Sequence, residues 1–167
     1  MSGDAAWIDA DLTISASVLR EIEAHAIREY PSECCGFILG PADQVDSLDE
    51  ARAEVNEADK YHRLDPERFP RTSRTYFKIN ELRAARLFES AAAEARPVKV
   101  IYHSHCDTGA YFSEEDAATF AIDGTLMWPC AFLVVSVRSG KIDDRRLWVH
   151  VPGTEDFVER ALHIEST

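Results

Sequence analysis

The chain of 167 residues has few basic side chains, and none of its cysteines are spaced for a disulfide scaffold or a structural metal site. Its 18 lysines and arginines are outnumbered by 30 aspartates and glutamates, which gives a net charge of −12. A surface of this sign repels a phosphate backbone, so we do not expect nucleic acid as the main partner. A basic protein partner would fit the charge better, although the charge is equally compatible with a role in solubility alone.

Long apolar runs are also missing. No segment is able to span a bilayer, and residues 1–12 contain three aspartates in place of the basic start and apolar core of a secretory signal. We therefore expect a cytoplasmic protein that does not bind membranes. Its four cysteines, at positions 34, 35, 106 and 130, lack the Cys-x-x-Cys spacing of structural zinc sites and redox motifs and should be free thiols. The sequence shows no internal repeat or linker, so residues 1–167 are expected to form one domain.

The apolar pattern predicts helices and strands in alternation. Helices are expected at residues 15–30, 80–95 and 113–122, with a short final helix at 154–162. The face of the second helix that packs on the core is expected to include Leu82, Ala85, Leu87, Phe88 and Ala92. Strands are expected at 34–40, 98–102, 131–137 and 145–151, with a turn at Gly140, and the polar stretch 41–77 should hold an irregular insertion with one or two weaker strands. This alternation indicates an α/β fold, a mixed β-sheet flanked by helices.

Two histidines follow directly after the predicted strand 98–102. His103 and His105 are separated by one residue, so on an extended chain both imidazoles point to the same face. Asp116 falls in the first turn of the next predicted helix, where its carboxylate can reach back towards the end of the strand. Three nitrogen and oxygen ligands with a fourth position for water are typical of a catalytic zinc site, so we expect about one zinc ion per chain.

Two further residues are candidates for the chemistry. Glu33 precedes the predicted strand 34–40, and its carboxylate would reach a metal-activated water as general base if this strand lies beside the one with the histidines. Ser113 would lie near the metal and donate a hydrogen bond to the developing oxyanion. Ser113 is also an ordinary helix N-cap, and it could serve as both.

The order of these residues resembles a known family. The spacing from His103 through His105 and Ser113 to Asp116 is the His-x-His-x7-Ser-x2-Asp pattern of the JAMM (MPN-domain) metallopeptidases. Residues 31–40, Pro-Ser-Glu-Cys-Cys-Gly-Phe-Ile-Leu-Gly, are similar to the segment that carries the catalytic glutamate in small bacterial members, and residues 132–137 are similar to the strand that follows the metal helix.

This resemblance implies a single JAMM domain with an architecture like that of cytidine deaminases, and a zinc-dependent peptidase or isopeptidase related to deubiquitinases. The implied substrate is the C-terminal tail of a ubiquitin-like or sulfur-carrier protein. The metal ligands would be His103, His105 and Asp116, with Glu33 as acid and base and Ser113 as oxyanion donor. Precursor processing, removal from a target and release of an amino acid all require the same site, so the sequence leaves the reaction and the oligomeric state open. Many members have proline where this chain has Cys106, whose thiol would either pack as a small apolar group or act as an oxidation switch.

Two other functions fit the sequence less well. Relatives of the family that have lost their metal serve as scaffolds, but a scaffold has no need of a complete ligand set. A zinc deaminase would need a Pro-Cys-x-x-Cys ligand pair, of which only Pro129-Cys130 is present, since Leu133 stands at the fourth position. The remaining histidines, His25, His62, His150 and His163, lack ligand spacing and are expected to be structural. For the stretch around Arg71, Arg74, Tyr76 and Phe77, and for Tyr111 and Phe112, both contact with the substrate tail and simple packing remain open.

Overall fold

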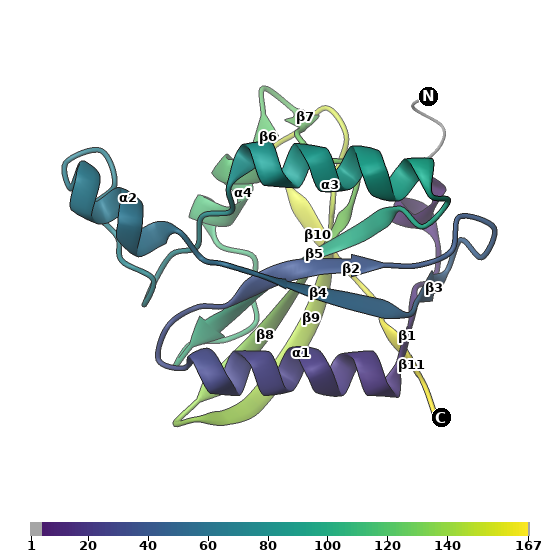
Figure 1. The fold of residues 1–167 in the computed structure, drawn as a ribbon, viewed down its shortest axis with the longest axis horizontal. Helices are drawn as coiled ribbons and strands as arrows, with labels where there is room; N and C mark the ends of the chain where they lie inside the picture. The colour runs from purple at the N-terminus through teal and green to yellow at the C-terminus, as the bar shows by residue number, and fades with distance from the viewer. Residues whose placement is uncertain (1–4, 167) are drawn as a thin grey trace.

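The computed structural model describes residues 5–166, and its centre is a six-stranded mixed sheet with the order β10-β9-β8-β5-β2-β4 (Figure 1). Its strands are β2 (Cys35–Leu39), β4 (Glu50–Glu54), β5 (Val98–Cys106), β8 (Ala131–Arg138), β9 (Lys141–His150) and β10 (Phe157–Arg160). Strands β5 and β8 are parallel, and the other neighbours are antiparallel. The expected α/β fold with a mixed sheet flanked by helices is confirmed.

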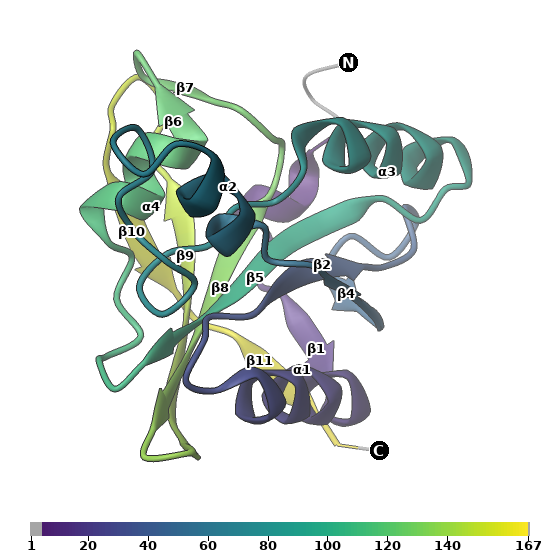
Figure 2. The same ribbon diagram turned by 60° about the vertical axis from the view of Figure 1, so that its left-hand side comes forward.

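Helices cover both faces of this sheet. Helix α1 (Ala16–Glu29) packs on one face, and α3 (Glu81–Ala93) and α4 (Glu114–Phe120) pack on the other. Helix α2 (Ala58–Leu64) lies beyond the end of the sheet in Figure 1 and comes towards the viewer in the turned view (Figure 2). Two apolar cores result, one between the sheet and α1 and one between the sheet and α3 with α4. None of the helices in the described part of the chain has the length and apolar character that a membrane crossing requires.

Helix α1 forms where the apolar spacing predicted it. Ser15 is its N-cap, and the side chain of Ser15 accepts a hydrogen bond from the backbone N–H of Val18. Such a cap stabilises a helix by about 1 kcal/mol. The buried residues are Val18, Leu19, Ile22, His25 and Ala26, which form one stripe at spacings of three and four.

The expected core face of the second helix was partly wrong. Helix α3 lies within the predicted range 80–95 and follows the N-cap Asn80, and Leu87 and Phe88 are half-buried. Leu82, Ala85 and Ala92 are exposed, and the buried positions are Ala84 and Ala91. The stripe that faces the sheet therefore consists of residues 84, 87, 88 and 91, which recur at the spacings of three and four of one helical face.

The prediction of a final helix at 154–162 was wrong, because residues Phe157–Arg160 form strand β10. This strand pairs with the outer edge of β9, where Phe157 lies opposite His150, and the Phe157 ring packs 4.3 Å from that of Phe112. Pairing with a free sheet edge outweighed the local helical pattern. The insertion 41–77 contains the two strands expected there, and in addition helix α2, which was not predicted.

Short elements complete the fold. The 3-10 helix η2 (Ala6–Asp9) precedes β1 (Thr13–Ser15), which forms a small parallel sheet with β3 (Ser47–Leu48) and β11 (His163–Glu165). The hairpin β6 (Ala121–Ile122) and β7 (Thr125–Leu126) follows α4, which ends at Phe120 and not at the expected 122. Gly140 makes the predicted turn between β8 and β9 with φ +78, a left-handed value that glycine adopts without strain.

Candidate active site

The histidines lie inside a central strand and not just beyond it. Strand β5 continues to Cys106, past the predicted end at 102, and is paired with β2 on one side and β8 on the other. His103 and His105 point to the face covered by α4, and both are buried. Backbone pairing on both sides therefore fixes the two imidazoles before any ligand binds.

Asp116 is held by the start of helix α4. Ser113 is the N-cap, and its Oγ accepts from the Asp116 N–H at 3.0 Å. The Ser113 N–H in turn donates to Asp116 Oδ2 at 3.1 Å, which completes a capping box. The local sequence thus aims the carboxylate back at the strand, and Ser113 has the predicted role of helix cap.

Three donor atoms converge at this point. His103 Nε2 lies 3.0 Å and His105 Nε2 lies 3.4 Å from Asp116 Oδ2, and the two nitrogens are 3.2 Å apart. Ligands of a tetrahedral zinc ion lie about 2.0–2.1 Å from the metal, so two of them are separated by roughly 3.3 Å. The donors have the mutual distances of such ligands. A cation is the group that all three lone pairs can share, so these residues fit a metal of the zinc type.

The surroundings orient the histidines. His105 Nδ1 lies 2.9 Å from the Gly109 carbonyl, a contact that needs the proton on Nδ1 and leaves Nε2 free as a donor to metal. The His103 ring is stacked on Phe77, with ring centroids 4.2 Å apart, and its Nδ1 has no hydrogen-bond partner among the described residues. Phe77 is therefore buried against a candidate ligand, which agrees with the packing role that the sequence left open for it.

Protonation favours metal binding. Burial raises the pKa of the Asp116 carboxyl, but the charge of His103 and hydrogen bonds from both histidines outweigh burial and hold this pKa well below its ordinary range. Burial lowers the pKa of His103, although Asp116 opposes this. An ionised carboxylate and a neutral imidazole are the forms that coordinate metals.

Glu33 is brought to the same place by strand pairing. Cys35 lies opposite His103 in the antiparallel pair of β2 and β5, so the same register continued by two residues places Glu33 opposite His105, on the same face. Ser104 strengthens this end of the pair, because its Oγ accepts from the Cys34 N–H at 2.7 Å.

The backbone of Glu33 is also fixed from the insertion. Its N–H donates to the Ser73 carbonyl at 2.7 Å, and its carbonyl accepts from Asn56 Nδ2 at 2.9 Å. Asn56 also donates to the Tyr76 carbonyl and accepts from the N–H groups of Ala58 and Lys78. Asn56 and Ser73 were not identified from the sequence, which contains no spacing signal for them.

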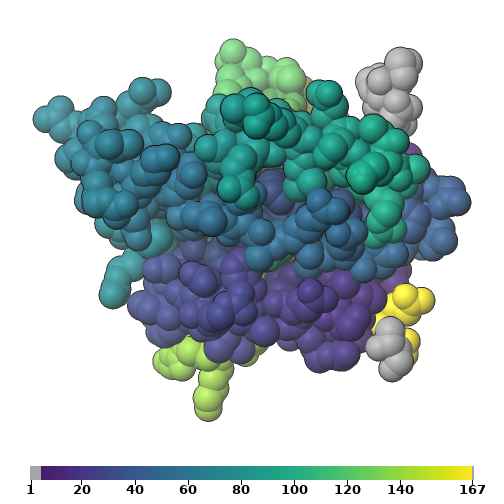
Figure 3. All heavy atoms as spheres, in the orientation of Figure 1, coloured from purple at the N-terminus to yellow at the C-terminus, as the bar shows by residue number. Residues whose placement is uncertain are grey.

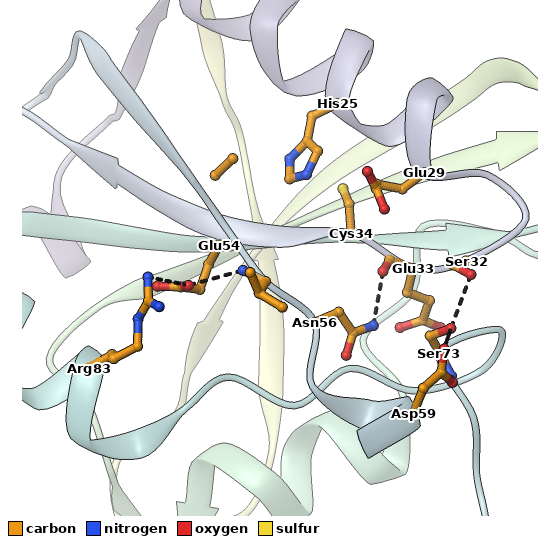
Figure 4. A pocket seen from close by; sticks show the side chains of 12 residues that line it. His25, Glu29, Ser32, Glu33, Cys34, Glu54, Asn56, Asp59, Ser73 and Arg83 are labelled. Atoms are coloured by element: carbon orange, nitrogen blue, oxygen red, sulfur yellow. Dashed lines mark hydrogen bonds and ion pairs between the residues drawn. The ribbon is translucent and has the colours of Figure 1, made fainter. Parts of the chain in front are cut away.

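The Glu33 carboxyl is buried between two cavities. One, of about 100 Å³, also contains His105, Ser113 and Asp116 in its wall. The other, of about 420 Å³, runs along the end of β4 past Asn56 and Ser73 (Figure 4). Burial raises the pKa of Glu33 to about 9, and Asp116 adds to the rise while Arg71 opposes it. A bound cation would oppose this rise as well, so Glu33 is suited to accept and return a proton.

The remaining candidates divide between the site and the core. Arg71, Arg74, Cys106 and Tyr111 line the smaller cavity, whereas Phe112 packs in the core. Three of the four other histidines have structural contacts, as expected: His25 Nδ1 with Tyr102 OH at 2.7 Å, His62 Nδ1 with the Phe69 carbonyl, and His150 Nε2 with the Thr154 carbonyl. His163 is exposed in β11.

The chain belongs to the family described as prokaryotic homologs of the JAB domain, whose model matches residues 15–151. This range includes the segment of Glu33, strand β5 and helix α4. The family resemblance drawn from the sequence is therefore confirmed.

Individual relatives agree with this assignment. The chain is 32% identical over 108 residues to proteins named CysO-cysteine peptidase, among them one from Mycobacterium tuberculosis, and the match covers 63% of this chain and 62% of theirs. The fold is similar to that of a protein from Desulfitobacterium hafniense (TM-score 0.67, 20% identity, 93% of this chain and 94% of that one). It is also similar to a JAB1/MPN domain protein from Archaeoglobus fulgidus (TM-score 0.53, 15% identity, 93% and 99%).

Proposed function

We propose that this chain is a zinc-dependent peptidase that hydrolyses an amide bond at the C-terminal tail of a ubiquitin-like or sulfur-carrier protein. The observation that carries the proposal is the convergence of three metal-type donors within 3.0 to 3.4 Å of one another, with Glu33 in the wall of the same cavity. The name of the mycobacterial relatives, CysO-cysteine peptidase, supports a carrier protein as substrate.

The protein side chains would divide the chemistry between them. His103, His105 and Asp116 would hold the zinc ion, which when bound lowers the pKa of its water to about 7. Glu33 would accept a proton as this water attacks the carbonyl carbon and return it to the leaving nitrogen. The Ser113 hydroxyl, whose oxygen already accepts from Asp116, keeps its own hydrogen for the developing oxyanion.

The larger cavity suggests where the tail would bind. β4 is the last strand of the sheet, so within residues 5–166 its outer edge has no strand neighbour, and the cavity along its end includes Glu33 in its lining. In the space-filling view this edge lies between α3 and α1 (Figure 3). An extended tail could add here as a further strand, with main-chain hydrogen bonds for affinity. Glu29, Glu54 and Asp59 line the cavity and would favour a tail without acidic residues.

Glu33→Gln tests the proposal most directly. The amide keeps the size and hydrogen bonding of the carboxyl but cannot accept a proton, so turnover should fall by roughly 100- to 10,000-fold while zinc remains bound. We would measure zinc per chain and cleavage of a ubiquitin-like or sulfur-carrier protein with a C-terminal extension. Glu89→Gln, at an exposed position of α3, is the matched control and should behave as wild type.

The possible outcomes are distinct. Near wild-type turnover in Glu33→Gln would show that another group is the base. Zinc-loaded wild-type protein that cleaves no carrier fusion would favour a binding module of the same fold and contradict the proposal.

A further inference from the structure

The two candidate histidine ligands differ in what fixes their rings. His105 has a hydrogen-bond partner behind it, because its Nδ1 lies 2.9 Å from the Gly109 carbonyl. His103 Nδ1 is buried and has no such partner among residues 5–166. A metal-binding histidine usually has its ring oriented by a hydrogen bond that the second ring nitrogen donates. The orientation of His103 therefore depends on a contact of another kind.

That contact is the flat face of an aromatic ring. The rings of Phe77 and His103 are stacked, with centroids 4.2 Å apart and planes inclined by 22°. Phe112 adds an edge contact to the same imidazole at a centroid distance of 6.3 Å. His103 has no exposed surface, and Phe77 is 4% exposed. In so closely packed a region, rotation of the imidazole about its bond to Cβ would bring it into the Phe77 ring.

Phe77 is itself held by its backbone neighbours and by a second ring. Asn56 Nδ2 donates to the Tyr76 carbonyl at 3.0 Å, and Asn56 Oδ1 accepts from the Lys78 N–H at 3.0 Å. One side chain thus ties down the residues before and after Phe77. The ring of Phe120, at the end of α4, stacks on Phe77 at a centroid distance of 5.8 Å. The insertion and α4 together set the position of the Phe77 ring.

We infer that Phe77 is a positioning residue, whose ring holds the His103 imidazole in the orientation in which Nε2 meets the other two metal donors. This inference rests on the zinc site of the proposed function. His103 Nε2 lies 3.2 Å from His105 Nε2 and 3.0 Å from Asp116 Oδ2. A ring that is already fixed in this orientation loses little conformational freedom when a cation binds. The apolar ring also excludes water from one face of the ligand, which strengthens the attraction between the donors and a cation.

The alternative is that Phe77 contributes only to the apolar core. Phe37 of β2 belongs to the same core and is 1% exposed, but its ring contact is with Phe88 of α3 and not with a histidine. Replacing either phenylalanine by leucine removes a similar amount of buried apolar surface, so both changes should lower stability. Only the change at Phe77 should alter the affinity for a metal. The two residues therefore separate packing from ligand positioning.

Phe77→Leu and Phe37→Leu are the matched variants. Thermal unfolding of the metal-free proteins is measured first, and both variants should have a lower Tm than wild type. Zinc affinity is then measured by competition with a chromophoric chelator, at a temperature where each protein is folded. Phe77→Leu should bind zinc about tenfold more weakly than wild type, an effect typical of groups that orient a metal ligand. Phe37→Leu should keep the wild-type affinity.

Two further variants at the same position sharpen the test. Phe77→Tyr keeps the flat ring, and Phe77 lines a cavity of about 40 Å³ that gives room for a hydroxyl group. This variant should bind zinc more tightly than Phe77→Leu and close to the wild-type affinity. Phe77→Met also lacks a ring but adapts more easily to the space, and it takes the place of Phe77→Leu should that variant not fold.

The outcomes distinguish the inference from the function on which it rests. Weaker zinc binding in Phe77→Leu, with recovery in Phe77→Tyr and none of the loss in Phe37→Leu, supports the positioning role. Wild-type affinity in Phe77→Leu, an equal loss in Phe37→Leu, or an equal loss in Phe77→Tyr overturns it. Wild-type protein that takes up no zinc contradicts the metal site of the proposed function, and the inference with it.

Discussion

The two faces of the central sheet are built from the same strands, and both carry an apolar core, but only one of them also carries the candidate metal donors. On the α1 face, β2, β5 and β8 contribute buried apolar side chains such as Ile38, Val100 and Leu133. Tyr102 also lies on this face, and its hydroxyl is satisfied by His25 at 2.7 Å. On the α4 face, the end of β5 carries two histidines that meet a buried carboxylate.

Because of this difference, the α1 face contributes to the stability of the fold only, whereas the α4 face also holds the residues proposed for the chemistry. Alternate residues of a strand point to opposite faces, so one strand can supply an apolar core on one side and ligands on the other. Buried polar and charged groups cost free energy unless they are paired or bind a metal. The α1 face therefore stabilises the strand that holds the ligands, and a cation would offset the cost of the ligands on the α4 face.

The largest effect should come from Asp116→Asn. The amide keeps the shape of the side chain and an oxygen to accept from Ser113, but it loses the charge that binds a cation. Zinc content should fall well below about one per chain, and activity should be lost. Elemental analysis after native purification measures the first effect and carrier cleavage the second.

Thermal unfolding provides a second readout of the same site. Adding zinc should raise the Tm of wild type by mass action and raise that of Asp116→Asn much less. Wild-type protein that is metal-free as purified and takes up no added zinc would contradict the metal site itself.

A substitution on the α1 face should lower the stability of the fold and leave zinc binding unchanged. Leu133→Ala removes a fully buried side chain from the α1 face and should lower the free energy of unfolding by about 2 to 5 kcal/mol. Zinc per chain should stay unchanged at temperatures where the variant is folded. Denaturant unfolding and elemental analysis on one preparation check both, and loss of zinc from the folded variant would show that the two faces are coupled.

The smallest effect is expected for Cys106→Ala. Cys106 ends β5 next to the candidate ligand His105 and lines the smaller cavity, but it is not among the three candidate metal donors. If it packs only as a small apolar group, stability should change by less than about 0.5 kcal/mol, with activity and its sensitivity to peroxide unchanged. Peroxide inactivation that disappears in the variant would instead establish an oxidation switch.

The sequence predicted the parts of the fold with a strong local pattern. Helix α1 has a cap and a regular apolar stripe, and β2, β5 and β8 are apolar runs bounded by turns. Strand β10 and the short strands β1 and β11 have no such pattern, because they exist only through pairing with distant edges. The spacing of the two histidines already fixed their common face, whereas the core face of α3 depended on how closely the helix approaches the sheet.

Gly36, which follows Cys35, is another residue whose presence the sequence shows but whose physical reason only the packing explains. Gly36 was part of the family segment, but its physical reason lies in the packing of β2. A Cβ at this position would lie 2.5 Å from the Arg52 carbonyl oxygen and 2.5 Å from the Tyr102 ring. Glycine is needed there because strand and ring approach so closely.

By itself, the sequence identified the candidate ligands His103, His105 and Asp116, the capping role of Ser113 and the candidacy of Glu33, because each depends on residue type and on short-range geometry. Tertiary structure alone decided which groups surround them. Asn56 and Ser73 fix the backbone of Glu33, and of the two alternatives left open for Arg71 and Arg74 the fold places both in the lining of the smaller cavity. These residues come from an insertion with little periodic pattern, and its path is set by contacts with β2 and α4 that only the folded chain makes.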